Sequence, residues 1–151
     1  MGIGANLGDS ELTAAMAAAA VAGLGYGARV SSLYRTEPEG FAHQPAFCNA
    51  VVELWTSWRP EHLMALLMRI EQRFGRARRA RWGPRTLDLD LLLYDGWIVD
   101  KPTMTLPHPR LLERRFVLVP LAELNPHLVL PNGIQVAEAL AMTERQEVAR
   151  W

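Results

Sequence analysis

The sequence predicts an α+β fold: a ferredoxin-like antiparallel sheet with helices packed on it, plus a C-terminal extension. Two observations carry this prediction. Several short segments alternate apolar and polar residues, and two segments between them follow the helical period. In chain order they read strand, helix, strand, strand, helix, strand. With 151 residues, half of them apolar, the chain has the size of one domain, so we expect residues 1–151 to form a single domain.

Capping and breaking residues set the limits of the elements in the first half of the chain. Asp9 or Ser10 can cap a helix, Pro60 suits the first turn of another, and Gly75 is placed to end it. The first strand is so short that we expect the natural strand to begin before Met1. The expected elements are a strand over 1–7, a helix to about 24, a strand over 28–36, a loop over 37–46, a strand over 47–56 and a helix over 60–74.

The second half begins with a basic loop over residues 75–85 and a strand over residues 86–94. Asp95-Gly96 is a strong two-residue turn signal, which predicts a hairpin with residues 97–99. The prolines at 107 and 109 make a rigid loop. The remaining expected elements are a short helix over 111–124, interrupted near Pro120, and a last helix from about 135.

The composition excludes several classes of protein. No apolar run reaches the ~18 residues that a membrane span needs, and the alanine-rich residues 14–22 lack the basic leader of a signal peptide. Cys48 is the only cysteine, so no internal disulfide can form, which fits the cytoplasm. The formal net charge of zero gives no overall attraction to nucleic acid or to anionic membranes. We expect a cytoplasmic protein.

Aspartates and leucines alternate directly after an arginine-rich turn, within Arg81-Trp-Gly-Pro-Arg-Thr-Leu-Asp-Leu-Asp90. Residues i and i+2 of a strand share a face, so the leucines should face a core while Asp88 and Asp90 project together from the other side. Aspartate is depleted in strands, and like charges on one face repel. Carboxylates beside guanidinium groups suggest Mg²⁺ bound between protein and phosphate, with an exposed strand face as the alternative.

Seven arginines lie between Arg69 and Arg85, against a single acid, Glu71. Such a cluster is typical of a solvated loop, of a phosphate site or of a nucleic-acid surface, and the residues leave these interpretations open. Trp82 offers a stacking surface that suits a nucleotide base as well as RNA. His108, held between two prolines, is placed to hydrogen-bond a phosphate.

Two common nucleotide-binding motifs are absent from the sequence. Gly2-x-Gly4-x-x-x-Gly8 misses the dinucleotide fingerprint because its third glycine comes one residue late. We interpret it as a turn that keeps Asn6 close to other elements. The sequence also lacks the Gly-x-x-x-x-Gly-Lys of P-loop proteins.

Several motifs taken together resemble one family over the full length of the chain. They are Gly4-Ala-Asn-Leu-Gly-Asp9, Tyr34-Arg-Thr-x-Pro38 with Gln44, Phe47 and Asn49, Glu71 with Gly75-Arg-x-Arg78, the Arg81 to Asp90 block, and Pro107-His-Pro-Arg110 with Arg114 and Phe116. The chain is similar to the 6-hydroxymethyl-7,8-dihydropterin pyrophosphokinases of folate biosynthesis. The resemblance implies transfer of pyrophosphate from ATP to the hydroxymethyl group of the pterin, with release of AMP. The expected partners are these two substrates, without nucleic acid or membrane, and we expect a monomer.

The resemblance also implies a role for each matched side chain. Asp88 and Asp90 would hold two Mg²⁺ ions on the triphosphate, while Arg76 and Arg85 would act on the transferring group. The pterin would be bound by Thr36, Pro38, Phe47, Asn49 and Phe116, with the aromatic rings on its faces and the amide at its edge. The ATP side would be lined by Glu71, Arg78, Trp82, Leu91, Thr105, His108 and Arg114.

The sequence departs from the family pattern at a few positions, and two other functions stay open. Ala5 stands where serine is usual, and Glu37 and Glu39 stand where apolar residues are frequent. An RNA-binding module could use the arginine-tryptophan loop, although zero net charge and the paired aspartates argue against it. A nucleotidyltransferase would release pyrophosphate rather than AMP.

Overall fold

The structure of the protein is a computed structural model that describes residues 1–38, 44–75, 86–143 and 146–151. The strands are β1 (Gly2–Ala5), β2 (Gly27–Val30), β3 (Tyr34–Thr36), β4 (Phe47–Trp55), β5 (Asp88–Asp90), β6 (Val99–Lys101), β7 (Met104–Leu106) and β8 (Val148–Arg150). The helices are α1 (Ser10–Ala22), α2 (Pro60–Arg73), the 3₁₀ turn η1 (Leu111–Glu113), α3 (Arg115–Leu124) and α4 (Val136–Met142).

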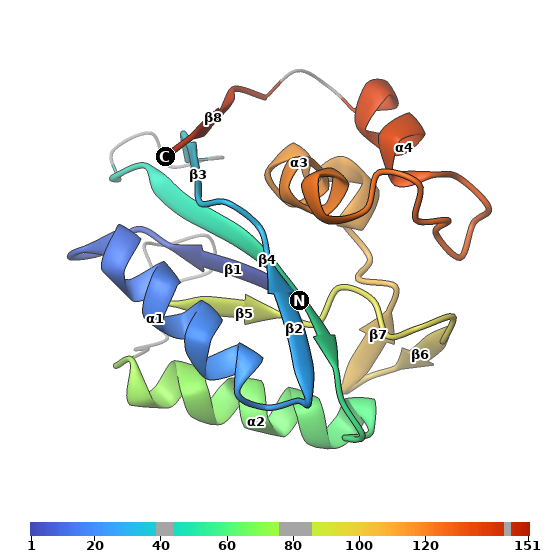
Figure 1. The fold of residues 1–151 in the computed structure, drawn as a ribbon, viewed down its shortest axis with the longest axis horizontal. Coiled ribbons are helices and arrows are strands. Elements are labelled where there is room, and N and C mark those ends of the chain that lie inside the picture. Colours follow the sequence, from blue (N-terminus) through green and yellow to red (C-terminus); the bar gives the residue numbers. More distant parts are fainter. Residues whose placement is uncertain (39–43, 76–85, 144–145) are drawn as a thin grey trace.

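The sheet confirms the predicted ferredoxin-like α+β fold. Its antiparallel strands follow the order β5-β1-β4-β3-β8, and β2 also pairs with β4 (Figure 1). The first and last strands of the predicted β-α-β-β-α-β series, β1 and β5, are therefore neighbours. Helices α1 and α2 lie on one side of this sheet, and α3 and α4 lie on the other (Figure 1). Strand β8 brings the C-terminal extension back to the sheet, where it pairs with β3.

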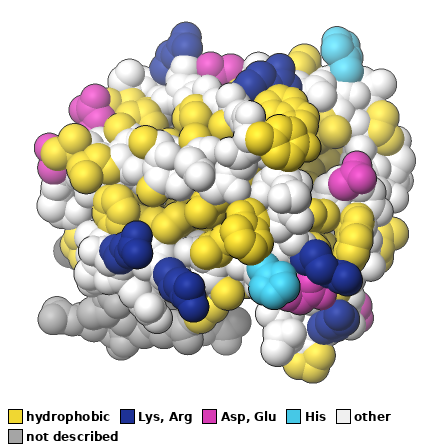
Figure 2. All heavy atoms as spheres, turned by 60° about the horizontal axis from the view of Figure 1, so that its bottom comes forward, with side chains coloured by type: hydrophobic (Ala, Val, Ile, Leu, Met, Phe, Trp, Pro, Cys, Tyr) yellow, Lys and Arg dark blue, Asp and Glu magenta, His cyan; other side chains and the backbone are white. Residues whose placement is uncertain are grey.

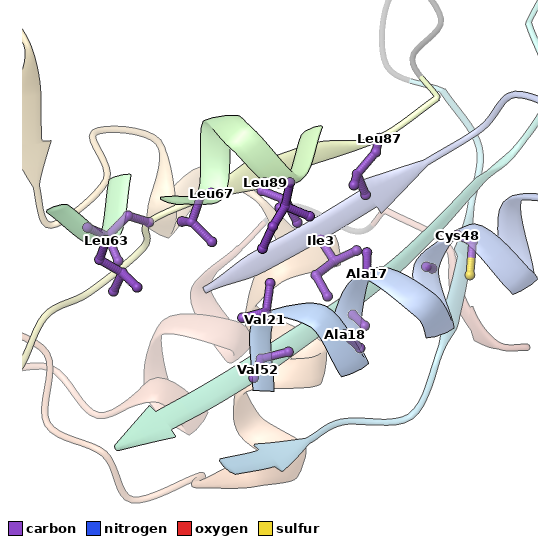
Figure 3. Packing of buried hydrophobic residues seen from close by; sticks show 14 of the residues in the cluster. Ile3, Ala17, Ala18, Val21, Cys48, Val52, Leu63, Leu67, Leu87 and Leu89 are labelled. Carbon is purple, nitrogen blue, oxygen red and sulfur yellow. The ribbon is translucent and has the colours of Figure 1, made fainter. Parts of the chain in front are cut away.

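The larger hydrophobic core lies between the sheet and helices α1 and α2, where side chains from both layers point toward one another (Figure 3). Helix α1 presents small buried residues to the sheet, which lets its backbone approach closely. Helix α2 buries Leu63, Leu67 and Ile70 at helical spacing, as its pattern predicts. The predicted inward leucines at 87, 89 and 91 are all buried in this core.

A second, smaller core lies on the opposite side of the sheet, under α3 and α4. Val51 of β4 and Leu92 after β5 contact it from the sheet side. The helix break predicted near Pro120 is wrong: η1 and α3 separate at Arg114, and α3 continues through Pro120. The proline ring is buried with Val117, Leu118 and Leu121, so burial of that apolar face outweighs one missing backbone hydrogen bond.

The hairpin predicted after β5 is also wrong. Residues 94–97 form a turn, with Trp97 N donating to Tyr94 O at 3.0 Å, but β6 pairs with β7 instead of with β5. Strand β5 ends at Asp90, which pairs with Gly2, the first residue of its partner β1. The Leu92 carbonyl then accepts from His108 N at 2.8 Å, so the proline-flanked loop lies beside this segment.

The single strand predicted over residues 28–36 is interrupted by a bulge. Val30 pairs with Val52 and Tyr34 pairs with Asn49, so three residues of this strand face two of β4. Ser31 fills the gap: its backbone N donates to Val51 O, and its Oγ accepts from Val51 N, both at 2.9 Å. The bulge reverses which residues share a face with Asn49, from odd numbers in β2 to even numbers in β3.

The surface carries charges of both signs. Figure 2 turns the lower side of Figure 1 forward, and on that face the described basic and acidic side chains are scattered among hydrophobic ones. This distribution agrees with the formal net charge of zero. Among the described residues, we find no helix with the length and apolar character to cross a membrane.

Candidate active site

A single pocket brings together most of the residues predicted to bind pterin and metal. It opens on the α3 side of the sheet, and its empty space measures about 820 Å³ with the solvent at its mouth included. Strands β1, β4 and β5 contribute residues to it, and so do β3, α3 and the C-terminal segment. Its lining includes Thr36, Phe47, Asn49, Asp88, Asp90, Arg114 and Phe116.

The floor of the pocket is made by two glycines of β1. Gly4 lies between Asn49 and Asp88 in the sheet, and Gly2 pairs with Asp90. A Cβ built on Gly4 would come within 3.4 Å of Asn49 Oδ1, so any larger residue would fill space that a ligand can use. The interpretation of the glycine motif as a turn holds at Gly8, with φ of 64°, whereas Gly2 and Gly4 lie in the strand that leads into it.

The polar wall of the pocket is built from buried amides and a hydroxyl. Asn49 Nδ2 donates to Thr36 Oγ1 at 2.8 Å, which fixes the amide and leaves its oxygen above Gly4. The prediction that Asn6 lies close to another element is confirmed, since its Nδ2 donates to Gln44 Oε1 and to Pro45 O, both at 3.1 Å. This bond holds Gln44 at the edge of the pocket.

The acidic end of the pocket lies on β5. Asp88 and Asp90 are both half-buried and flank the buried Leu89, as the alternation predicts. Asp90 Oδ2 accepts from Arg114 Nη1 at 3.0 Å. The Arg114 guanidinium carbon also lies 5.7 Å from the centre of the Phe116 ring, so this side chain joins the acidic strand to the aromatic wall.

Two carboxylates on one strand fit a hard divalent cation such as Mg²⁺. Within residues 1–38, 44–75, 86–143 and 146–151, no group of three or more His, Cys, Asp or Glu side chains forms a closed metal cage. An Mg²⁺ ion typically takes one or two protein carboxylates and completes its shell with phosphate oxygens and water. The donor set on β5 therefore suits a metal that arrives with a phosphate ligand.

His108 lies beside this acidic end. Its Nδ1 accepts from Arg110 N at 3.1 Å, which leaves Nε2 at 3.8 Å from Asp90 Oδ2 and 3.5 Å from Arg114 Nη1. Burial lowers the pKa of His108 below its ordinary value of 6.5, and the neighbouring arginines lower it further, although Asp90 opposes them. His108 is thus held mainly in its neutral form near neutral pH.

Besides His108, three described residues predicted to line the ATP side are not part of the pocket lining. Glu71 is buried on α2, and its Oε1 accepts from Leu89 N at 2.8 Å, so it holds β5 from behind. Leu91 lies in the core under α1 and α2, and Thr105 is exposed on β7. Their placement beside the nucleoside stays a prediction. Pro38 is half-buried and is not part of the pocket lining.

Four residues predicted for the site fall outside the described residues: Arg76, Arg78, Trp82 and Arg85. The structure also adds pocket residues that the sequence analysis did not assign to the site. Gly2 and Gly4 alternate with a buried isoleucine, and that period of two was available as a signal. Gln146 had no local signal, because it precedes β8, a strand that the sequence pattern did not predict.

Comparisons with known proteins agree with the geometry. A family described as 7,8-dihydro-6-hydroxymethylpterin-pyrophosphokinase matches residues 1–126. A protein of Methylorubrum extorquens named 2-amino-4-hydroxy-6-hydroxymethyldihydropteridine pyrophosphokinase is 44% identical over 99% of this chain and 96% of its own. Proteins of the same name from Bacillus subtilis and Pseudomonas aeruginosa are 43% and 46% identical, covering 99% and 80% of this chain and 87% and 75% of their own.

Proposed function

We propose how this site works on the premise that the chain belongs to the 7,8-dihydro-6-hydroxymethylpterin-pyrophosphokinase family. The protein is an enzyme of folate biosynthesis that transfers pyrophosphate from ATP to the hydroxymethyl group of 6-hydroxymethyl-7,8-dihydropterin and releases AMP. One observation carries the proposal: a single pocket has aromatic rings and an amide at one end and two carboxylates at the other.

The pterin binds at the aromatic end, between Phe47 and Phe116. A flat heterocycle gains stacking area between two rings, and the fixed Asn49 amide offers an oxygen to the N–H groups of the pterin edge. Thr36 acts by holding that amide, and Pro38 shapes the wall beyond it. The glycine floor leaves room for the ring to lie close to the sheet.

The triphosphate binds at the acidic end, where Asp88 and Asp90 hold two Mg²⁺ ions. When bound, Mg²⁺ spreads the negative charge of the phosphates and polarises the transferring group. Arg114 neutralises Asp90 before the nucleotide arrives and keeps further donors for phosphate oxygens. In the described part of the chain its Nε is buried without a hydrogen-bond partner, which supports that role.

The chemical step joins the two ends of the pocket. The hydroxymethyl oxygen of the pterin attacks the β-phosphorus of ATP, the bond from that phosphorus to the α-phosphate oxygen breaks, and AMP leaves. Arg76 and Arg85 stabilise the charge that develops on the transferring group. The nucleotide side is served by Arg78, Trp82, Glu71, Leu91, Thr105 and His108. The Nε2 atom of His108 lies 3.8 Å from Asp90 Oδ2.

The whole chain, residues 1–151, forms one pyrophosphokinase domain and acts as a monomer. The addition of β8 to the same sheet through β3 supports a single domain, although the family match ends at residue 126. We place the enzyme in the cytoplasm, where ATP is plentiful and where the buried thiol of Cys48 stays reduced.

The test is a product assay with purified protein, ATP, the pterin and Mg²⁺. AMP and the pterin diphosphate should form in equal amounts, and neither should form in excess EDTA. Arg76→Ala should lower kcat far more than it weakens the binding of either substrate, because the contact made by Arg76 forms in the transition state. Release of free pyrophosphate instead of AMP would identify a nucleotidyltransferase and overturn the proposal.

A further inference from the structure

The C-terminal segment reaches into the pterin end of the pocket. Gln146 lines the same pocket as Thr36 and Asn49. It lies beyond residue 126, where the match to the family ends.

The pairing of β8 with β3 aims Gln146 at the pocket. Val148 pairs with Thr36, and Arg150 pairs with Tyr34, so these four side chains share the face that Asn49 also occupies. Gln146 comes two residues before Val148, and it lines the pocket on this same face of the sheet. The side chain therefore projects beside Thr36, at the edge of the amide wall.

Strand β8 and the residue after it are held in place by a network of hydrogen bonds. Arg150 Nε donates to Ser32 Oγ at 2.9 Å, and the Glu123 carboxylate accepts from Ser32 and from the Tyr34 hydroxyl. At the end of the chain, Trp151 Nε1 donates to Glu11 Oε2 at 2.8 Å, and Trp151 N donates to Leu33 O at 2.8 Å. Together with the bond from Arg150 Nη2 to Glu123 Oε1 at 3.5 Å, they tie the end of the chain to α1, α3 and the bulge.

The side-chain oxygen of Gln146 is a buried acceptor without a donor. Among the described residues, Gln146 Oε1 is one of a few buried side-chain polar atoms that make no hydrogen bond. A buried acceptor left unpaired costs free energy, so such an atom in a ligand pocket indicates that the ligand supplies the donor. The Nδ2 atom of Asn49 already donates to Thr36 Oγ1, and the Oδ1 atom faces the pocket floor.

We propose that Gln146 is a pterin-binding residue that accepts a hydrogen bond from an N–H group of the pterin and so helps to select that heterocycle. The proposal rests on the proposed function of the pocket. A pterin carries more than one N–H donor along its edge, and the Asn49 oxygen can satisfy only part of them. Gln146 adds a second acceptor from the opposite end of the chain, which makes recognition of the edge depend on the C-terminal strand.

The test compares Gln146→Met, which keeps the length and loses the acceptor, with Gln146→Glu, which keeps an acceptor. Gln146→Met should weaken pterin binding by roughly tenfold in a titration, with the ATP affinity unchanged. Gln146→Glu should restore most of the loss, a recovery that a merely structural role would not give. The matched control is Glu147→Gln, a change at the exposed neighbouring residue, which should bind as wild type does.

The outcomes separate this inference from the function itself. Wild-type pterin affinity in Gln146→Met, an equal loss of ATP affinity, or no recovery in Gln146→Glu would overturn the role of Gln146 while the wild type still releases AMP. A wild type that neither binds the pterin nor releases AMP would overturn the function of the pocket instead. Thermal unfolding of each variant checks folding, and Gln146→Ala replaces the methionine variant if that one is unfolded.

Discussion

The two faces of the sheet carry alternate side chains of the same strands, and they differ in role: one face is packed in the core and the other lines the pocket. Toward α1 and α2, the strands present Ile3, Cys48 and Leu89, all buried against helices. Toward α3, the adjacent residues of those strands are Gly4, Asn49 and the two aspartates, and they line an open pocket. The difference teaches that a period of two lets each short strand contribute to folding and to binding with alternate side chains.

The pocket face is less completely packed because part of its surface is left for ligands. Helices α3 and α4 cover Val51 and Leu92 but stop short of the glycine floor. Substitutions on the pocket face should therefore lower activity with little loss of stability, and substitutions on the core face should lower stability with little loss of activity. The following predictions test that separation.

The largest effect is expected from Asp90→Asn, which removes charge and keeps volume. We expect kcat to fall at least roughly a thousandfold, or ~4 kcal/mol in the barrier, with the unfolding midpoint near that of wild type. Steady-state assays in Mg²⁺ and thermal unfolding measure the two quantities. Glu138→Gln, the same chemical change on exposed α4, is the control and should retain activity. Normal turnover in Asp90→Asn would show that β5 is not the metal strand.

Leu89→Ala should show the opposite behaviour one residue away. Leu89 is 6% exposed and packs in the core with α1 and α2. Its truncation should lower the free energy of unfolding by about 2–4 kcal/mol, while the fraction that remains folded keeps most of its kcat. Denaturant unfolding followed by assays well below the midpoint checks both. A loss of kcat as large as that of Asp90→Asn would mean that the two faces are not separable.

Gly4→Ala should have a smaller effect, confined to the pterin. The added methyl group would lie 3.4 Å from Asn49 Oδ1, which narrows the floor without a severe clash. Pterin affinity should fall roughly fivefold, or ~1 kcal/mol, while ATP affinity and stability change little. Calorimetric titration measures the affinities. Gly96→Ala, where a Cβ would meet nothing within 4 Å, should leave both affinities as in wild type.

The smallest effect concerns the pH dependence of stability at the pocket edge. Burial lowers the pKa of His108 below 6.5 in the folded protein, so the unfolded chain binds more protons in the window just below that value. Stability should therefore fall as the pH drops from 6.5 toward the folded pKa, and this part of the fall should disappear in His108→Asn. Unfolding free energies measured across that window test the sign. Equal slopes in both proteins would contradict it.

The sequence carried the local features of both faces. Asp88 and Asp90 flank a buried leucine as their alternation predicts, and α2 buries the side chains that its period indicates. The order of elements was sufficient to predict the ferredoxin-like sheet, which the strand pairing confirms. Local periods, caps and turn residues act over a few neighbours, so they can be read without knowing what the chain packs against.

Long-range packing decided what the local patterns left undetermined. Helix α3 continues through Pro120 because its apolar face is buried, and β5 ends at Asp90 because its partner β1 begins at the paired residue, Gly2. The turn at Asp95 forms, but it does not make a hairpin. In each case a tertiary contact outweighed a local preference of comparable or smaller energy.

The sequence by itself determined the family and the acidic strand, and it predicted which residues carry the chemistry. Only the tertiary structure placed Gly4 as the floor between Asn49 and Asp88, and only the bulge beside Ser31 turned Thr36 into the pocket instead of Arg35. It alone brought Gln146 to the same wall. The physical reason is that strand register depends on pairing between segments far apart in the chain, and a shift of one residue exchanges the two faces.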